Sequence, residues 1–224
     1  MDAQMSSLLC LLLLAALGCA VVVSLTEEIT VLQGTETTFP LNMRDVSTFN
    51  YLIWTLHGNA VVLKEQGKPT LTLLPALAGR VTLQEPSGSL QIRNVSLADS
   101  GLYVAAVQKG SERRPLQRYC LLVFDIMSNA VTWPNGSCSL ELTCHVARSQ
   151  DRNITYSWKR TDVNRDPSTQ GPKLSLYLDP SSKSLSYNCT AQDTSNSSSL
   201  GIKPYQFCRS SVEAAGRCCF KPLV

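Results

Sequence analysis

Tyr187-Asn188-Cys189 is the stretch that decides the fold of the second half of this 224-residue chain, because Cys144 and Trp158 precede it. In a sandwich of two antiparallel sheets, a cysteine on an early strand bonds to one on a late strand, and a tryptophan packs on that bridge. A tyrosine two residues before the second cysteine fixes a corner of the sandwich. The pattern therefore predicts an immunoglobulin-like β-sandwich with a Cys144–Cys189 disulfide.

The first half repeats this pattern with one difference. Its tryptophan and tyrosine are Trp54 and Tyr103, whereas Leu41 and Ala105 stand where the two cysteines are expected. Because an inter-sheet disulfide contributes roughly 2–4 kcal/mol, apolar packing by Leu41, Ala105 and Trp54 has to replace it. The chain is therefore predicted to form two tandem immunoglobulin-like sandwiches, of which the first has no inter-sheet disulfide.

Apolar runs of strand length alternate with turn residues in both halves, and the fold class is predicted to be all-β. Strands in the first half are predicted at 29–31, 37–41, 52–55, 61–63, 71–74, 80–83, 89–92, 101–108 and 117–124. Nine strands are typical of a variable-type domain, which is predicted to comprise residues 25–125. Strands in the second half are predicted at 130–133, 139–146, 154–158, 173–178, 184–191 and 206–209. They leave no room for additional edge strands, which favours a constant-type domain at residues 126–209.

Residues 1–24 are interpreted as a secretory signal peptide. The apolar run at 6–18 is shorter than the roughly 20 residues that span a bilayer, and small residues follow it. No later apolar stretch reaches that length, so we expect an extracellular protein, secreted as written or on the external side of the plasma membrane if a longer, anchored form exists. Residues 210–224 form a short cysteine-containing tail, which is native, an alternative transcript end or an incomplete gene model.

The cysteines predict a second disulfide in the second half. Two of the nine cysteines lie in the leader, and an odd number remains. Cys138 precedes the strand of Cys144 and Cys208 stands at the end of the last predicted strand, so Cys138 and Cys208 are the natural second pair. A zinc site is the alternative, but no CxxC spacing occurs and a secreted chain favours disulfides. The sequence leaves open the states of the other cysteines, Cys120, Cys218 and Cys219.

Five Asn-x-Ser/Thr sequons agree with passage through the secretory route, and four of them fall in the second half. They predict N-linked glycans at Asn94, Asn135, Asn153, Asn188 and Asn196. Chance in a serine-rich chain is the alternative explanation.

The run Asp99-Ser100-Gly101-Leu102-Tyr103 is the most specific local motif of the first half. Tyr103 is expected to point inward and donate its hydroxyl to the backbone, while Gly101 accommodates the tight backbone there. We also expect an ion pair between Asp99 and Arg80, since variable-type domains pair such residues; two unrelated surface charges are the alternative. The residues predicted to stabilise each sandwich internally are Trp54, Arg80, Asp99 and Tyr103 in the first and Trp158 and Tyr187 in the second.

Charge and motif content disfavour several functions. The formal net charge of +3 is too small to suggest a nucleic-acid partner. The two histidines, His57 and His145, fall in different halves, so no Ser/His/Asp or Cys/His set is assembled. The chain is therefore predicted not to be an enzyme and to need no cofactor or small-molecule substrate. The pattern favours a protein-recognition module.

Short motifs in both halves resemble the SLAM (signalling lymphocytic activation molecule) family of immune-cell receptors. Those of the first half are Thr38-Phe39-Pro40-Leu41-Asn42, Ile53-Trp54-Thr55, Gly79-Arg80-Val81, Ser89-Leu90-Gln91-Ile92 and the stretches 94–101 and 119–124. Those of the second half are Asn135-Gly136-Ser137-Cys138, Leu142-Thr143-Cys144, the stretches 154–158 and 185–192, and a late Cys208. A variable-type domain without the disulfide, followed by a doubly bridged constant-type domain, is itself characteristic of that family.

The resemblance implies an adhesion and recognition receptor that modulates leukocyte activation. Such receptors bind a like protein or a related immunoglobulin-family receptor on another cell through the front sheet of the first domain. Strand alternation then predicts the partner-binding residues Tyr51, Ile53, Thr55, Leu102, Val104, Ala106 and Gln108. The loop after that strand adds Lys109, Arg113, Arg114 and Arg118. The basic residues among them are interpreted as a loop that suits an acidic partner surface. The alternative is a solvated basic loop beside ordinary apolar surface.

Two other functions remain open on the sequence. A secreted or virus-encoded soluble decoy uses the same face to block such contacts. A structural extracellular glycoprotein predicts no saturable binding to leukocytes and no sensitivity to charge reversal at Arg113 and Arg114.

Overall fold

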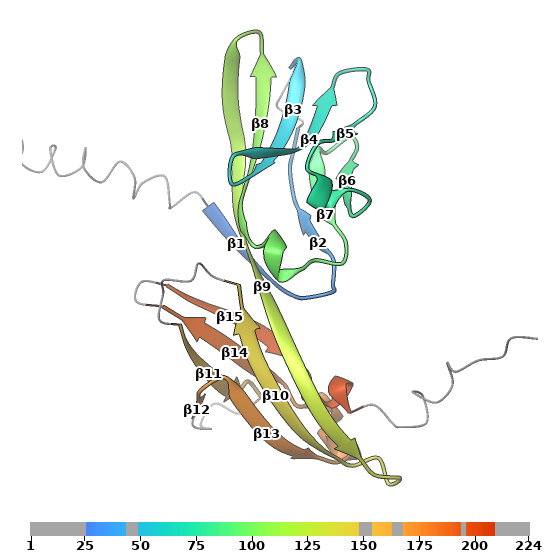
Figure 1. Ribbon diagram of the computed structural model, residues 1–224, viewed down its shortest axis with the longest axis vertical. Coiled ribbons are helices and arrows are strands. Elements are labelled where there is room, and N and C mark those ends of the chain that lie inside the picture. The colour runs from blue at the N-terminus through green and yellow to red at the C-terminus, as the bar shows by residue number, and fades with distance from the viewer. Residues whose placement is uncertain (1–25, 44–48, 148–153, 163–167, 194–195, 209–224) are drawn as a thin grey trace, which may run out of the picture. The chain divides into compact units, whose positions relative to one another are not determined.

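The computed structural model describes residues 26–43, 49–147, 154–162, 168–193 and 196–208 (Figure 1). These residues form strands and short 3₁₀ helices, so the predicted all-β fold is confirmed. Among these residues, none of the helices has the length and apolar composition of a membrane span. The predicted leader, the tail with Cys218 and Cys219, and Asn153 lie outside the described residues.

The chain divides into two compact units. The first holds the described residues up to 29 together with 34–95 and 99–122, and the second holds 123–208 with the short segments 30–33 and 96–98. Strand β9 (Glu112–Thr132) passes from the first unit into the second: it pairs with β8 before the passage and with β10 after it.

The first unit is built from two antiparallel sheets. The larger sheet has the order β9, β8 (Gly101–Lys109), β3 (Tyr51–Leu56), β4 (Asn59–Glu65) and β5 (Leu71–Thr72), and β1 (Thr26–Leu32) also pairs with β9. The smaller sheet has the order β2 (Thr37–Phe39), β7 (Ser89–Ile92) and β6 (Val81–Gln84). Two 3₁₀ turns, η1 (Pro75–Leu77) and η2 (Leu97–Asp99), lie between strands. The extra strands β4 and β5 in the larger sheet are those of a variable-type domain.

A cluster of aromatic rings fills the core of the first unit. Phe39, Trp54 and Tyr103 are fully buried, and Phe39 stacks on Tyr103 with ring centroids 4.5 Å apart. Leu41, which the sequence analysis assigned to the core, is only half-buried and lies beyond the end of β2. Because Pro40 has no N–H to donate to a sheet, β2 ends at Phe39. Phe39 therefore makes the packing that we expected of Leu41.

The corner before β8 is fixed by a fully paired aspartate. Both carboxylate oxygens of Asp99 accept hydrogen bonds from the Arg80 guanidinium, at 2.7 and 2.9 Å, and Asp99 is 3% exposed. Arg80 also donates to the carbonyls of Ala76 and Asn94. The Tyr103 hydroxyl donates to the carbonyl of Asp99 at 2.8 Å. The expected ion pair and tyrosine hydrogen bond are thus both present in the structure.

The second unit is also a two-sheet sandwich. One sheet has the order β13 (Lys173–Leu178), β10 (Cys138–Val146) and the later part of β9. The other has the order β12 (Thr169–Gln170), β11 (Thr155–Arg160), β14 (Tyr187–Gln192) and β15 (Ser197–Ile202). The 3₁₀ helices are η3 (Pro180–Ser184) and η4 (Pro204–Phe207). The two-stranded pairing of β12 with β11 was missed by the sequence analysis.

Two disulfides link the second unit, with the pairing that the sequence predicted. Cys144 bonds to Cys189 and Cys138 bonds to Cys208, with Cα atoms 6.5 and 6.0 Å apart. Trp158 is 1% exposed, and its indole N–H donates to the carbonyl of Pro172 at 2.9 Å. The prediction of a second, doubly bridged sandwich is confirmed. Tyr187 is half-buried, in contrast to the fully buried Tyr103.

The end of the second unit differs from the prediction. The last strand is Ser197–Ile202, and the segment predicted as a strand, 206–209, includes part of η4. Ser198 and Ile202 are buried while Ser197 and Ser199 are exposed, so a serine-rich stretch alternates like a half-buried strand. Pro204 at the start of η4 suits a helical first turn. Cys208 therefore follows a 3₁₀ helix and not a strand.

Candidate recognition surface

The front face of the first unit is the outer face of its larger sheet. Residues that lie directly opposite in an antiparallel ladder share a face. From β4 to β9, the register aligns one row of polar and aromatic residues, Glu65, Tyr51, Gln108 and Arg113. This row has an acidic end on β4 and a basic end on β9.

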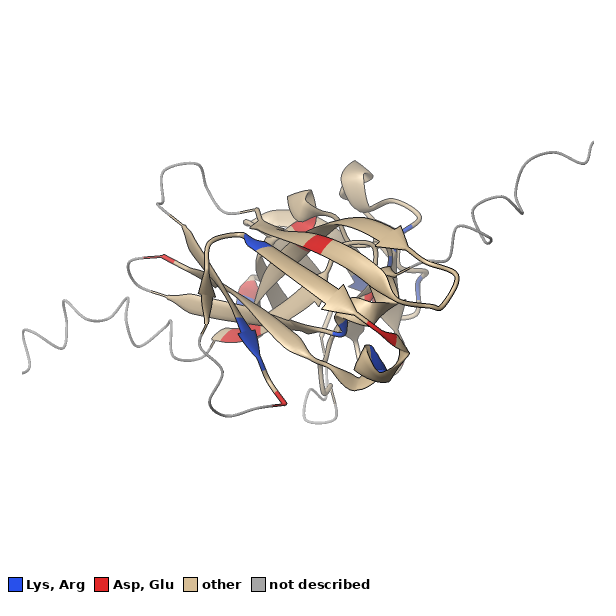
Figure 2. Cartoon of the chain, turned by 90° about the horizontal axis from the view of Figure 1, so that it is seen from below, with Lys and Arg blue, Asp and Glu red and all other residues tan. Residues whose placement is uncertain are grey.

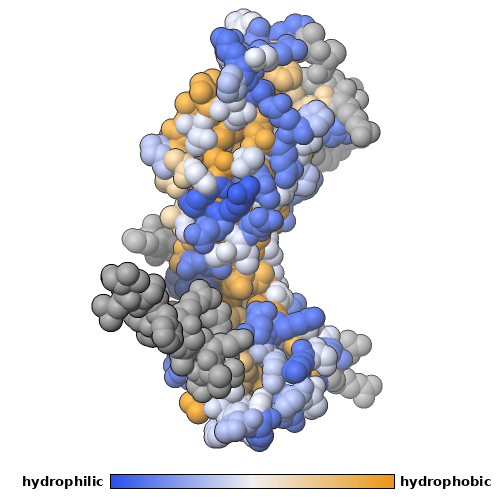
Figure 3. Space-filling view, turned by 90° about the vertical axis from the view of Figure 1, so that its right-hand side faces the viewer, coloured by the Kyte–Doolittle hydropathy of each residue, from blue (hydrophilic) through white to orange (hydrophobic). Residues whose placement is uncertain are grey.

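The neighbouring rows of the front face are mostly apolar. From β5 to β9, the second row consists of Leu71, Leu63, Ile53, Ala106 and Pro115. The third row consists of Ala60, Thr55, Val104 and Arg118. In the fourth row, Leu102 lies opposite Cys120. Leu71 and Leu102 are 55% and 40% exposed. Figure 3 shows hydrophobic residues gathered on the visible side of the first unit.

Two predicted partner-binding residues are buried, which corrects the sequence analysis. Thr55 is 3% exposed, and its hydroxyl donates to the carbonyl of Val104 at 3.4 Å. Ala106 is 2% exposed, because its short side chain lies between the larger Ile53 and Pro115 in the same row. Alternation predicted the face of Ala106, but neighbouring side chains decide its exposure.

The basic residues do not form a loop, which is a second correction. The turn between β8 and β9 has only two residues, Gly110 and Ser111, and Arg113, Arg114 and Arg118 lie on β9. Arg113 pairs with Gln108 and belongs to the front face. Arg114 pairs with Val107, which is 6% exposed and points inward, so Arg114 belongs to the other face.

Lys109 lies two residues after Val107 on β8, so it belongs to the same face as Val107 and not to the front face. It is exposed because it lies at the end of the hairpin. The opposite orientation of Arg114 agrees with a groove behind the front face. That groove is lined by Glu27, Pro40, Leu41, Asn42, Arg114, Leu116, Gln117 and Tyr119. Sequence reasoning missed the extra residue on β9, Leu116, where the register shifts.

Asn50 holds the tip of the hairpin in place. Its side-chain carbonyl accepts a 2.6 Å hydrogen bond from the backbone N–H of Gly110, and its own backbone N–H donates to the carbonyl of Gln108. The acidic end of the first row is also held, because Glu65 forms an ion pair of 2.9 Å with Lys68. Sequence reasoning identified neither Asn50 nor Glu65, since both belong to the site only through the strand register.

Charges of both signs are interspersed along the chain (Figure 2). Among the described residues, no group of three or more His, Cys, Asp or Glu side chains is placed to hold a metal ion. Cys120 takes part in neither disulfide and is half-buried, between the buried Tyr119 and Leu121.

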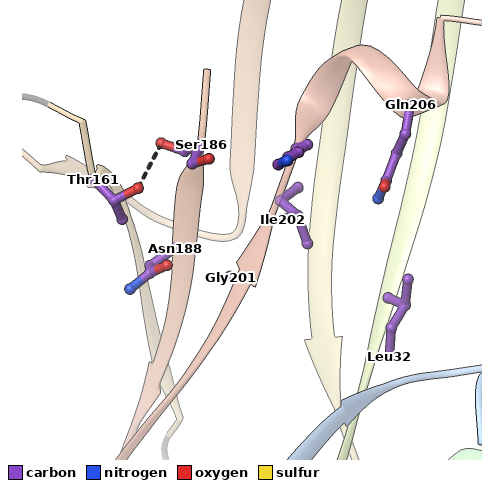
Figure 4. Close-up of a pocket in the computed structure, with 8 residues that line it drawn as sticks. Leu32, Thr161, Ser186, Asn188, Gly201, Ile202 and Gln206 are labelled. Atoms are coloured by element: carbon purple, nitrogen blue, oxygen red, sulfur yellow. Dashed lines mark hydrogen bonds between the residues drawn. The ribbon is translucent and has the colours of Figure 1, made fainter. Parts of the chain in front are cut away.

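The described sequons have different surroundings. Asn94, Asn135 and Asn196 are exposed. Asn188 lies within β14, is half-buried, and lines a shallow pocket of the second unit (Figure 4). That pocket also includes Leu32, Thr161, Ser186, Gly201, Ile202, Lys203 and Gln206, and Thr161 donates to the carbonyl of Ser186 at 3.1 Å.

No protein-family model matches the sequence. The human T-lymphocyte surface antigen Ly-9 is 28% identical over 184 residues, which cover 78% of this chain and 28% of Ly-9. Mouse SLAM family member 5 is 26% identical over 183 residues, which cover 78% of this chain and 54% of that protein. The chain thus spans about half, or less, of the length of these curated relatives.

Among solved structures, the CD2-binding domain of CD58 is 15% identical, with a TM-score of 0.43, and the alignment covers 80% of this chain and 96% of that one. These sequence relatives agree with the resemblance that the motifs of both units predicted. The predicted resemblance of this chain to the SLAM family of immune-cell receptors is confirmed.

Proposed function

We propose that this chain is the extracellular part of an immune-cell recognition receptor, which binds a second copy of itself or a related immunoglobulin-family receptor through the front face of its first unit. The similarity to a lymphocyte surface antigen and to SLAM family receptors supports the class of protein. The chemistry of the front face supports the mode of binding.

The row Glu65, Tyr51, Gln108 and Arg113 is the observation that carries the proposal. In a dimer with a two-fold axis, every contact occurs twice. If residue i of the first copy contacts residue j of the second, then residue j of the first copy contacts residue i of the second. A face with one acidic and one basic end can therefore place Arg113 of each copy against Glu65 of the other. The apolar row beside it, with Ile53 and Leu63, supplies the area that leaves water.

Tyr51 is the expected centre of this contact. Interface energy concentrates in a few residues, among which tyrosine is enriched because it buries a large rigid ring and keeps a polar end. Tyr51 lies between the acidic and basic ends of the row and is half-buried. Its position on β3, between β4 and β8, limits the entropy lost on binding.

Sedimentation of the secreted full chain over a range of concentrations tests the proposal. We expect weak, reversible self-association, which Arg113→Glu removes because it places one carboxylate against Glu65 at each of the two symmetric contacts. Arg114→Glu is the matched control: it makes the same charge change at the next residue, on the other side of the sheet, and leaves association unchanged. Equal effects of the two variants contradict the proposed face.

A charge exchange sharpens the test. Glu65→Arg alone places like charges together, as Arg113→Glu does, so each variant by itself stays monomeric. Mixed together, the two variants restore both opposite-charge contacts, so the mixture associates. Failure of the mixture to associate contradicts the two-fold arrangement.

A related receptor as partner gives a different result. The wild-type chain then stays monomeric but binds leukocytes saturably, and Arg113→Glu weakens that binding more than Arg114→Glu does. No self-association and no saturable leukocyte binding together exclude the proposed function.

A further inference from the structure

An exposed apolar cluster lies on the second unit and shares no residue with the front face. Val131, Trp133 and Tyr177 are 58%, 42% and 69% exposed. Ser139 pairs with Val131 on one side and with Tyr177 on the other, so Val131 and Tyr177 share the outer face of one sheet. The Trp133 and Tyr177 rings contact each other, with centroids 5.9 Å apart and planes inclined by 47°. The two adjacent exposed rings form apolar surface that a bound group can shield from water.

The tryptophan opens a closed turn that contains a sequon. The backbone N–H of Trp133 donates to the carbonyl of Ser137, and the N–H of Gly136 donates to the carbonyl of Trp133, both at 2.9 Å. Gly136 has a φ of +79°, which glycine adopts without strain. Two Cα–Cα steps separate Trp133 from Asn135, so their Cα atoms are at most about 7.6 Å apart. This separation is short enough for a sugar on Asn135 to contact the indole ring.

The turn also orients the Asn135 amide. Its Oδ1 atom accepts hydrogen bonds from the Ser137 hydroxyl at 2.7 Å and from the Ser137 N–H at 3.1 Å. Ser137 is 2% exposed, whereas Asn135 is exposed, so the amide oxygen is held against the turn and the amide nitrogen is left for modification. N-glycosylation keeps the amide oxygen, so it leaves the acceptor of both hydrogen bonds in place.

We propose that Asn135 carries an N-linked glycan whose first sugar lies on the Trp133–Tyr177 pair. The donor is a lipid-linked oligosaccharide diphosphate of the secretory route. A bond forms between Asn135 Nδ2 and C1 of the sugar, the C1–O bond to the diphosphate breaks, and the diphosphate leaves with the electron pair while the amide loses one proton. The C–H groups on one face of the sugar then contact the electron-rich face of the indole.

Among the five sequons, only Asn135 has an aromatic residue two positions before it. The corresponding residues of the other sequons are Ile92, Asp151, Ser186 and Thr194. The site is thus distinguished by sequence, turn geometry and exposed aromatic surface together. It is independent of the front face, because it lies on the second unit and uses none of the same residues.

Fluorescence quenching measures whether the glycan covers Trp133. Trp54 and Trp158 are 0% and 1% exposed, so Trp133 is the tryptophan that acrylamide reaches. The full chain is secreted from animal cells, and peptide mass spectrometry first determines occupancy of Asn135. An amidase then removes the glycans and leaves aspartate at position 135, which keeps an oxygen acceptor for Ser137. Because a sugar covers one of the two indole faces, we expect removal to raise the quenching constant about twofold.

A double-mutant cycle measures whether the contact stabilises the second unit. The effect of glycan removal is measured in the parent chain and in Trp133→Ala. The other glycans contribute equally to both effects, so their contribution cancels in the difference. We expect glycan removal to lower the unfolding midpoint of the second unit by about 4 °C more in the parent than in Trp133→Ala. Met127→Ala is the matched control: Met127 is 55% exposed and lies on β9 away from the Trp133–Tyr177 pair, and its cycle should show no coupling.

Three results overturn the proposal. One is an unmodified Asn135 in the secreted chain. Another is a quenching constant that glycan removal leaves unchanged but dilution raises, which identifies a second copy of the chain as the group that covers Trp133. The third is a constant that rises only when residues 209–224 are deleted, which identifies that segment instead.

Discussion

The two units join their sheets by different chemistry. In the second unit the Cys144–Cys189 bond links the sheets beside the buried Trp158. In the first unit the ring of Phe39 lies 4.5 Å from that of Tyr103 and 5.9 Å from that of Trp54, with no covalent link. A disulfide stabilises mainly by restricting the unfolded chain, whereas a ring cluster stabilises the folded chain through the apolar area that it buries and through ring–ring packing.

This difference predicts different sensitivities. The second unit depends on redox state, because reduction removes its links. The first unit depends on the fit of its rings and on the hydrogen bonds that satisfy their polar ends, such as the bond from the Trp54 indole to the carbonyl of Gly88 at 2.9 Å. Variants that act on one unit alone therefore test the comparison, and hydrogen exchange followed by peptide separates their effects.

The largest effect is expected from removing the inter-sheet disulfide. Replacing both Cys144 and Cys189 by alanine should lower the free energy of unfolding of the second unit by about 4 kcal/mol, since the bond closes a long loop in the unfolded chain. Exchange in β10 and β14 should rise while exchange in β3 and β8 stays unchanged. Equal destabilisation of the two units contradicts separate stabilisation.

Arg80→Ala is the next largest change, and it acts on the first unit. It leaves the carboxylate of Asp99, which is 3% exposed, without its two hydrogen bonds from Arg80. Because Asp99 itself is buried, the loss of its charged partner costs about 3 kcal/mol. Arg93→Ala, which removes an exposed arginine from the same unit, is the control and should change stability little. Denaturant titration of both variants measures the difference.

The sequence predicted the features that depend on residue identity alone. Cysteine positions predicted both disulfides, and Tyr103 with Arg80 predicted the corner at Asp99. Features that depend on register or on neighbouring volume were not predicted. The extra residue Leu116 alters the pairing of β9, and the burial of Ala106 depends on the sizes of side chains in adjacent strands.

Phe39→Leu tests the ring cluster more gently. Leucine keeps an apolar side chain but removes the stacking on Tyr103 and the contact with Tyr119, whose rings lie 4.5 and 5.4 Å from that of Phe39. We expect the first unit to lose about 2 kcal/mol. Leu41→Ala is the comparison, because Leu41 is half-buried outside the cluster and should cost less. A larger loss for Leu41→Ala would place Leu41 back in the core, where the sequence analysis expected it.

The smallest effect at neutral pH, and the one that depends on pH, is expected from Tyr103→Phe. Removing the hydroxyl that donates to the backbone carbonyl of Asp99 should cost about 1 kcal/mol at pH 7. Burial, and next the nearby Asp99 carboxylate, raise the pKa of Tyr103 above its usual range. The unfolded tyrosine ionises near pH 10, while the folded one stays neutral.

The sign of the pH dependence follows from these pKa values. The contribution of Tyr103 is fully present below about pH 10 and falls as pH rises toward the folded pKa, by up to about 1.4 kcal/mol per pH unit. Tyr103→Phe should therefore be less stable than the parent at pH 7 and lose less stability between pH 10 and 11. Tyr177→Phe is the control, because it removes the hydroxyl of a tyrosine that is 69% exposed and lies in the second unit. If Tyr103→Phe keeps the full alkaline slope, the ring cluster is not what makes the first unit sensitive to pH.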